Sequence, residues 1–438
     1  MLELHEQPYT PHLPYLEETP FSADHCLKCN ICTQACPVAA VTPLFPGPKT
    51  VGPQAQRFRN GDLPSVDNSL DYCSSCGICT LVCPHGVRVM EINTQAKAHL
   101  AEAQPFGVKK FRNWILGRNA WWGLLGTPFA ALLNWLFTFK PFRWALEKTI
   151  GVSQRAAFPK WAGYTFRGWW RRRERAAKST PITAPTVVYY HGCSTNTYEP
   201  HIGKLAVQIL EKNGFRVIVP EQACCGLPMQ SNGDFPAARR FAAKNTEALA
   251  GYVRQGIPIV GTSASCIMAL KGDYQHVLGM DDEDTRTLAG GIYDMSEFLY
   301  RLHGEGKLNT AFRPVGDFSP DLRAMAAERR VPYHAPCQLK AHGMGRPALD
   351  LLDLIPGMNT LEMDAECCGV AGTYAYKVEK RQIAEDVGAP LFNRIKELGA
   401  PLAICDTETC RWHIAQLSGV KVVHPIEILA EAYGISAD

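Results

Sequence analysis

The chain contains the same short cysteine pattern twice, and this pattern most constrains what it can fold into. CLKCNICTQACP spans residues 26–37 and CSSCGICTLVCP spans residues 73–84. Three closely spaced thiolates can wrap three corners of one 4Fe-4S cubane, while the fourth cysteine begins the next element and ligates a second cubane. We therefore expect two 4Fe-4S clusters with interleaved ligands. The first ligand set is Cys26, Cys29, Cys32 and Cys83, and the second is Cys73, Cys76, Cys79 and Cys36.

Structural zinc is the main alternative for these cysteines. Zinc sites usually come as two CxxC pairs separated by a longer loop, and the doubled run matches that spacing poorly. Disulfides are also disfavoured. The N-terminus has neither the basic start nor the apolar run of a secretory signal, so we expect the chain to stay in the reducing cytosol. The 17 cysteines are therefore interpreted mainly as cluster ligands.

A basic, tryptophan-rich segment follows the cysteine runs. Between Lys109 and Lys178 there are 15 Lys/Arg residues and two acidic residues, although the whole chain has a net charge of only +3. Indole rings favour headgroup depth and cationic side chains favour anionic lipid, so this composition is typical of a segment in the membrane interface. Eight of the nine tryptophans lie here, namely Trp114, Trp121, Trp122, Trp135, Trp144, Trp161, Trp169 and Trp170.

The uncharged residues from 119 to 139 leave other interpretations of this segment open. Their length allows a membrane-spanning helix. Four residues interrupt the stretch, namely Gly123, Gly126, Pro128 and Asn134. A face that binds a partner protein is the other alternative. We favour an interfacial anchor, which the basic and aromatic run at 166–178 supports. Basic residues beside aromatic ones also suit nucleic-acid binding, but no other feature of the chain supports it.

The second half of the chain contains an internal repeat. Each copy has a lone cysteine, a CCG triplet and a final cysteine, at intervals of 31 and 41 residues in the first copy and 30 and 42 in the second. Agreement within one residue at both intervals indicates a duplicated domain. The cysteines are Cys193, Cys224, Cys225 and Cys266 in the first copy and Cys337, Cys367, Cys368 and Cys410 in the second.

Each copy alternates short apolar strands with helical patterns, such as the helix expected at 202–214 and the strand that follows it. This alternation predicts a parallel sheet. Cysteines at the ends of its strands then converge at the edge where α/β folds usually bind ligands. A glycine after each cysteine pair, Gly226 or Gly369, permits a tight turn. We expect iron-sulfur ligation, with buried structural cysteines or a zinc or mixed site as alternatives.

These patterns predict a multidomain protein with both α+β and α/β parts. Residues 1–105 are expected to form a mainly helical, ferredoxin-like domain that holds two clusters. Residues 106–180 form the basic amphipathic segment that contacts membrane or partner, and residues 181–310 and 311–438 form two duplicated α/β modules. A chain of 438 residues, 46% of them hydrophobic, is long enough for this number of domains.

Two ferredoxin-type runs followed by two CCG repeats resemble a known group of proteins. These are the cysteine-rich iron-sulfur subunits of anaerobic glycerol-3-phosphate dehydrogenase, glycolate oxidase and heterodisulfide reductase. The chain is most similar to the C-subunit family of anaerobic glycerol-3-phosphate dehydrogenase, from about Asp24 to Ala432. The similarity includes CLKCNICTQACPV, the loop FPGPKTVGP, GTPF at 126–129, CCGVAGTYAYK and HPIEILAEA.

The resemblance implies an electron-transfer subunit that accepts electrons from a separate flavoprotein dehydrogenase and passes them towards membrane quinone. It also implies a peripheral position on the cytoplasmic side of the inner membrane. The sequence has no GxGxxG, GxxxxGK[ST] or HExxH motif, so a partner would have to supply the flavin and the substrate chemistry. The alternatives are the iron-sulfur subunit of a glycolate or lactate oxidase and a catalytic subunit of the heterodisulfide reductase type. A redox-sensing scaffold protein is a further one.

The repeats depart from the family pattern at one position. Related CCG modules often end in CxxC, but Ser263 and Thr407 stand where the extra cysteine would be, and Cys405 lies two residues before Thr407. Each repeat could therefore bind an ordinary four-thiolate cluster, a modified cluster, or none. We expect at least the second repeat to bind an iron-sulfur cluster, with Cys405 as an alternative ligand.

Overall fold

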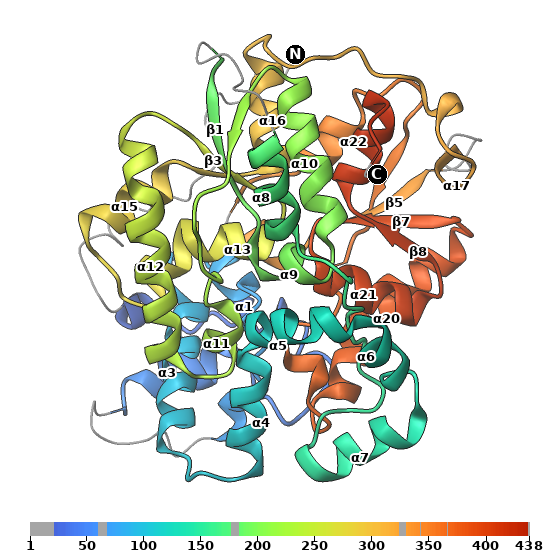
Figure 1. The fold of residues 1–438 in the computed structure, drawn as a ribbon. Helices are drawn as coiled ribbons and strands as arrows, with labels where there is room; N and C mark the ends of the chain where they lie inside the picture. Colours follow the sequence, from blue (N-terminus) through green and yellow to red (C-terminus); the bar gives the residue numbers. More distant parts are fainter. Residues whose placement is uncertain are drawn as a thin grey trace.

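In a computed structural model of the protein, two α/β modules lie side by side above a helical base (Figure 1). The structure describes residues 22–59, 68–176, 184–323, 330–341, 343–365 and 367–436. This architecture confirms the predicted fold class, a helical cluster-binding part followed by two duplicated α/β modules.

The first module contains a parallel four-stranded sheet in the order β2-β1-β3-β4. Val188 of β1 lies opposite Ile218 of β2 on one side and Ile259 of β3 on the other. The strands are β1 (Thr186–Tyr190), β2 (Arg216–Ile218), β3 (Ile259–Gly261) and β4 (Ile292–Asp294). The helices are α9 (Gly192–Thr197), α10 (Pro200–Lys212), α11 (Leu227–Ser231), α12 (Phe235–Arg254), α13 (Ala264–Met268), η6 (Ala269–Asp273), α14 (Tyr274–His276), α15 (Glu283–Gly290) and α16 (Met295–Gly304).

The second module repeats this topology with the order β6-β5-β7-β8, again with all strands parallel. The matching topology agrees with the duplicated domain that the two cysteine repeats predicted. Its strands are β5 (Val331–His334), β6 (Thr360–Glu362), β7 (Leu402–Cys405) and β8 (Lys421–Val423). Its helices are η7 (Val315–Asp317), α17 (Pro320–Arg323), α18 (Cys337–Ala341), α19 (Pro347–Leu352), η8 (Tyr374–Tyr376), α20 (Arg381–Glu397), α21 (Glu408–Ser418) and α22 (Pro425–Tyr433).

The dicluster region, residues 22–103, consists of short turns of helix followed by one long helix. The short elements are η2 (Ser22–His25), α1 (Ile31–Gln34), η3 (Thr50–Gln54), η4 (Asn68–Tyr72) and α2 (Ile78–Leu81). The long helix is α3 (Val89–Ala103), which follows the second cysteine run. Apolar side chains of this region share two cores with the modules, so it packs against both of them.

The tryptophan helices, α4 to α7, form the lower end of the molecule in Figure 1, beneath both modules. The apolar stretch 119–139 is not one helix, because Gly126 and Pro128 lie where it divides into α5, η5 and α6. The elements are α4 (Val108–Gly117), α5 (Asn119–Gly126), η5 (Thr127–Phe129), α6 (Ala130–Leu136) and α7 (Lys140–Ile150). Helix α8 (Phe166–Ala176) then leads into the first module.

Buried ion pairs fix the base to the second module. Arg112 of α4 donates from both terminal nitrogens to the carboxylate of Glu379, at 2.8 and 2.6 Å, while its side chain is 3% exposed. Lys380 is fully buried and lies 2.8 Å from the carboxylate of Asp71 in the dicluster region. Removing one partner of such a pair leaves an uncompensated buried charge. These contacts therefore hold the tryptophan helices and the dicluster region against the second module.

Candidate iron-sulfur centres

The first thiol set lies around one small cavity. Cys26, Cys29, Cys32 and Cys83 all line it, so residues far apart in the sequence meet there. Burial raises the pKa of the Cys32 thiol, and the nearby thiols of Cys26, Cys83 and Cys29 raise it further. Cys29 is exposed at the surface. This is the arrangement expected when the fourth cysteine of the second run joins the first three of the first run.

The second thiol set is assembled in the same way. The thiols of Cys76, Cys73 and Cys36 lie near the Cys79 thiol. Burial is the largest cause of the raised pKa of Cys79, and these three thiols raise it further. Burial also raises the pKa of Cys36, to about 11. The two runs share one local geometry. Asn30 and Gly77, immediately before α1 and α2, adopt left-handed conformations with φ of 76° and 87°.

The thiols of the first module gather at the carboxyl ends of three neighbouring strands. Cys193 follows β1, Cys224 and Cys225 follow β2, and Cys266 follows β3. The sulfur atoms of Cys193 and Cys224 are 3.8 Å apart. The Cys225 thiol hydrogen-bonds to both Cys224 and Cys266. The sequence therefore correctly predicted that the strand ends would converge.

The second module places its thiols in the same way. The hydrogen bond to Cys367 raises the pKa of Cys337, and the hydrogen bonds to Cys368 and Cys405 raise the pKa of Cys410. Cys405 ends β7 and is fully buried beside Cys410. It therefore remains a proposed alternative ligand.

The donor groups suit a polynuclear cluster better than a single ion. In the part of the chain that the structure describes, no three Cys, His, Asp or Glu side chains lie close enough to hold one metal ion. The first set instead surrounds one cavity, and seven thiols of the two modules border another, as a cubane with a thiolate at each corner requires. All eight cysteines of the dicluster region and all nine of the two modules are free thiols. These residues therefore fit 4Fe-4S clusters.

The second thiol set adjoins the second module. Burial raises the pKa of Cys76, and Cys367 is the neighbouring thiol that raises it most. Cys76 in turn raises the pKa of Cys337. A β-carbon on Gly77 would overlap that of Ala341 in α18, which shows how closely the two parts approach. The thiols thus form an unbroken series from the first set, through the second, to the second module.

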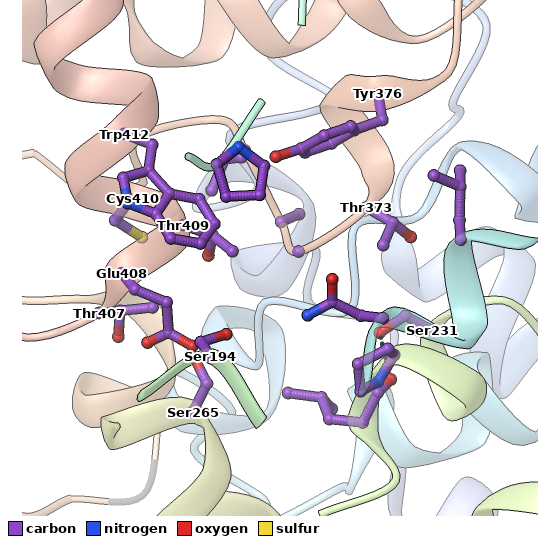
Figure 2. Close-up of a pocket in the computed structure, with 18 of the residues that line it drawn as sticks. Ser194, Ser231, Ser265, Thr373, Tyr376, Thr407, Glu408, Thr409, Cys410 and Trp412 are labelled. Atoms are coloured by element: carbon purple, nitrogen blue, oxygen red, sulfur yellow. Dashed lines mark hydrogen bonds between the residues drawn. The ribbon is translucent and has the colours of Figure 1, made fainter. Parts of the chain in front are cut away.

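A cavity of about 640 Å³ lies where the two modules meet the base. Its polar end carries Ser194, Ser265, Glu408 and Thr409, and Figure 2 shows Glu408 pointing towards Ser194 and Ser265. Burial raises the pKa of Glu408, and the neighbouring Glu199 raises it further. Ser263 donates a hydrogen bond of 3.0 Å to the Glu408 carboxylate, so this residue of the second module is held by the first.

One part of the cavity, which we call the neck, is apolar and is built by the tryptophan helices and by the loop that follows α7. Asn134 fixes the position of Trp161 with two hydrogen bonds of 2.9 Å to its backbone, and the Trp161 indole donates to the carbonyl of Trp122. Side chains that line the neck include Ile115, Leu116, Trp122, Leu125, Phe129, Leu133, Phe137, Leu146, Phe158 and Trp161. Three of them, Trp122, Leu125 and Phe129, are also exposed, so the neck opens at the surface.

The predicted membrane-contact segment divides into two parts with different environments. The tryptophan helices expose a set of large apolar side chains. In contrast, Phe166 and Trp170 of α8 are buried in the core of the first module. Arg171 and Arg173 pair with Glu221 and Glu211. The exposed set is Val108, Phe111, Trp114, Trp121, Trp122, Leu124, Leu125, Phe129, Leu132, Trp135, Phe139 and Trp144.

None of the helices in the described ranges could cross a membrane alone. The segments Asn119–Leu136 and Lys140–Ile150 have the length and apolar composition only when taken together, and they turn by 106° at the break between them. The single spanning helix considered from the sequence is therefore not formed by residues 119–139.

Several residues around the thiols were not singled out from the sequence. Asn119 of α5 donates a hydrogen bond of 3.6 Å to the Cys193 thiol, which joins the tryptophan helices to the first module. Ser265 and Thr409 occupy the same repeat position, directly before the final cysteine, and this shared position was the signal that the sequence offered. Glu408 carried no such signal, because its partner Ser263 belongs to the other repeat.

Comparison with known families agrees with this geometry. Residues 22–87 match the 4Fe-4S dicluster domain, and residues 187–271 and 331–415 each match the cysteine-rich domain. The matched ranges contain both thiol sets of the dicluster region and all the cysteines of the two modules.

Three relatives illustrate the similarity, and one of them matches nearly the whole chain. The C subunit of the anaerobic glycerol-3-phosphate dehydrogenase of Escherichia coli is 36% identical over 413 residues, which cover 94% of this chain and 98% of the relative. The B subunit of the fumarate reductase (CoM/CoB) of Methanothermobacter marburgensis is 29% identical over 255 residues, 56% of this chain and 46% of the relative. Lactate utilization protein A of Bacillus subtilis is 25% identical over 249 residues, 54% and 95% of the two chains.

Proposed function

Because the chain belongs to the family of C subunits of anaerobic glycerol-3-phosphate dehydrogenase, as its sequence predicted, we propose that it carries electrons from a flavoprotein oxidising glycerol 3-phosphate to a membrane quinone. The iron-sulfur electron-transfer role, the 4Fe-4S clusters and the association with dehydrogenase subunits follow from this membership. The identity of the substrate, the membrane contact and the quinone are the proposed part.

The observation that carries the proposal is the series of thiols from the surface to the large cavity. When bound, iron-sulfur clusters supply carriers of single electrons. The residues of the chain hold them close together, because Cys36 of the second set has Cys73 and Cys32 as thiol neighbours, one from each set. Cys76 then adjoins Cys367. Most of these thiols are buried, which keeps water away from the path.

The first thiol set is the proposed entrance for electrons. Cys29 is exposed there, and the apolar side chains of Leu27 and Ile31 beside it are 68% and 44% exposed. Exposed apolar residues around a redox site suit a protein partner. We place the flavoprotein at this end of the molecule and the exit for electrons at the cavity between the modules and the tryptophan helices.

The proposed membrane contact is the exposed apolar set on the tryptophan helices. Lys109, Lys140 and Lys148 are exposed on the same helices and can meet anionic headgroups. Aromatic side chains beside lysines are typical of a helix that lies in the membrane interface. This supports a peripheral protein on the cytoplasmic face of the inner membrane.

Replacing both Leu132 and Trp135 with glutamate is expected to release the protein from vesicles. These side chains of α6 are 58% and 62% exposed and do not line the cavity. Losing two apolar contacts lowers the bound fraction by about tenfold or more. The assay is co-sedimentation with vesicles that contain anionic lipid. The control is Phe58→Glu in the dicluster region, where the side chain is 86% exposed. If the double variant and the control bind vesicles equally, the tryptophan helices are not the surface that contacts the membrane.

The substrate is tested by reducing the clusters in the complex purified anaerobically from native membranes. Glycerol 3-phosphate, glycolate and lactate are added separately, and low-temperature electron paramagnetic resonance is recorded. We expect reduction by glycerol 3-phosphate alone. Reduction by glycolate or lactate would instead identify the chain as the iron-sulfur subunit of a glycolate or lactate oxidase with the same electron-transfer path. With clusters present and none of the three active, reduction of a disulfide becomes the leading function.

A further inference from the structure

We propose that the 640 Å³ cavity is the quinone site, with the quinone ring at the polar end between the modules and the isoprenoid tail in the neck formed by the tryptophan helices. This inference rests on the proposed function, because it names where the acceptor binds. Seven thiols of the two modules line its inner side, so bound clusters would take part of this volume, and the quinone would use the part that remains.

The polar end places a quinone ring next to the redox centres. Ser194 follows Cys193, Ser265 precedes Cys266 and Thr409 precedes Cys410, so three hydroxyl groups are covalent neighbours of thiols from both modules. Hydroxyls can donate to the two carbonyl oxygens of a quinone. Ser265 and Thr409 make no side-chain hydrogen bond to another residue that the structure describes, and both are half-buried. Their hydroxyls are therefore available to a ligand.

The neck suits the tail because it is lined by aliphatic and aromatic side chains. Leu133 of α6 and Phe137 lie along it, and Phe137 packs 5.4 Å from the ring of Trp161. Trp122, Leu125 and Phe129 line the neck and also belong to the exposed apolar set, so its mouth lies within the proposed membrane surface. A molecule dissolved in the bilayer can then enter without crossing water.

The clusters and the quinone use different parts of the cavity. Seven thiols of the two modules border its inner side, and the neck carries no cysteine. Space taken by clusters bound to these thiols therefore leaves the neck open. Oxidation of glycerol 3-phosphate to the ketone releases two electrons and two protons. The quinone takes up these two electrons, one at a time, and two protons from the solvent, and leaves as the quinol.

Leu133→Trp tests the neck. The larger side chain is expected to weaken quinone binding by about tenfold or more, because overfilling a packed site forces its neighbours to move. Leu136→Trp is the matched control. Leu136 lies on the same helix and is also half-buried, but it does not line the cavity. Binding of a naphthoquinone with an isoprenoid tail to the oxidised complex is measured by quenching of tryptophan fluorescence, since Trp122, Trp161 and Trp412 line the cavity.

Thr409→Val tests the polar end independently. The substitution removes one hydroxyl with little change of shape and is expected to weaken, by several-fold, both the tailed naphthoquinone and its tail-less dimethyl analogue. Steady-state reduction of the same quinones by glycerol 3-phosphate should show a raised KM. Reduction of a water-soluble redox dye by glycerol 3-phosphate should be unchanged in the Leu136→Trp control.

The outcomes separate the location of the site from the function. If cluster-containing Leu133→Trp binds the tailed quinone with wild-type affinity, the tail does not bind in the neck. If Thr409→Val binds it with wild-type affinity, the ring does not bind at the polar end. If Leu133→Trp lacks clusters, Thr409→Val decides alone. A wild-type complex that reduces the dye with glycerol 3-phosphate but neither binds nor reduces a naphthoquinone contradicts the proposed acceptor instead.

Discussion

Replacing Cys36 with serine is expected to remove about four irons per chain, the content of one 4Fe-4S cluster. Although Cys36 belongs to the first run in the sequence, its thiol lies beside Cys73, Cys76 and Cys79. The lost cluster should therefore be the one held by the second run. Iron and sulfide analysis of anaerobically purified protein gives the first measurement.

Double variants decide which set each cysteine belongs to without assigning spectra. Cys36→Ser combined with Cys73→Ser should lose no more iron than either change alone, because both remove ligands of one cluster. Cys36→Ser combined with Cys29→Ser should lose about eight irons, since two clusters are affected. The reverse pattern, in which Cys36 and Cys29 share one loss, would show that each run binds its own cluster.

Loss of the second cluster in Cys36→Ser should also stop electron transfer to the quinone. Cys36 is the residue that has thiol neighbours from both sets, Cys32 and Cys73. Without the second cluster, the exposed first set is separated from the thiols of the second module. Glycerol 3-phosphate should then reduce the first cluster in the complex but should not support reduction of quinone.

Residues close in sequence carried most of what could be predicted. The spacing of each cysteine run fixes which thiols can reach one cluster, and the structure gathers the same two groups of four. The repeat predicted that the second half is a duplicated α/β domain, and the two modules do share one strand topology. The breakers Gly126 and Pro128 also divided the apolar stretch 119–139 as their chemistry suggests.

Contacts between distant residues were beyond the sequence. Tryptophan beside arginine suits a membrane interface and also a helix packed on a sheet, and the pattern of α8 does not separate the two. Its Phe166 packs against Gly203 of α10, where a β-carbon would lie 2.6 Å from the ring. The hydrogen bond from Ser263 to Glu408 and the polar end of the cavity likewise exist only when the two modules meet.

Gly369→Ala is expected to abolish cluster binding in the second module. Gly369 follows the cysteine pair and has a φ of 85°, a left-handed conformation that costs an alanine about 1–2 kcal/mol. In addition, the new β-carbon would overlap the carbonyl oxygen of Ala384 in α20. This oxygen belongs to a helix backbone and cannot rotate away. The turn must therefore shift, and Cys367 and Cys368 shift with it.

The equivalent change in the first module provides the matched control. Gly226 has nearly the same φ, 87°, but its β-carbon would lie 3.1 Å from the carbonyl oxygen of Ala238. Gly226→Ala therefore carries the same conformational strain with only a mild contact, and should lower the melting temperature while most of the iron is retained. Iron analysis and thermal unfolding under anaerobic conditions compare the two. Equal iron loss in both variants would mean that the left-handed turn alone, and not the approach of α20, controls how the cysteine pair is placed.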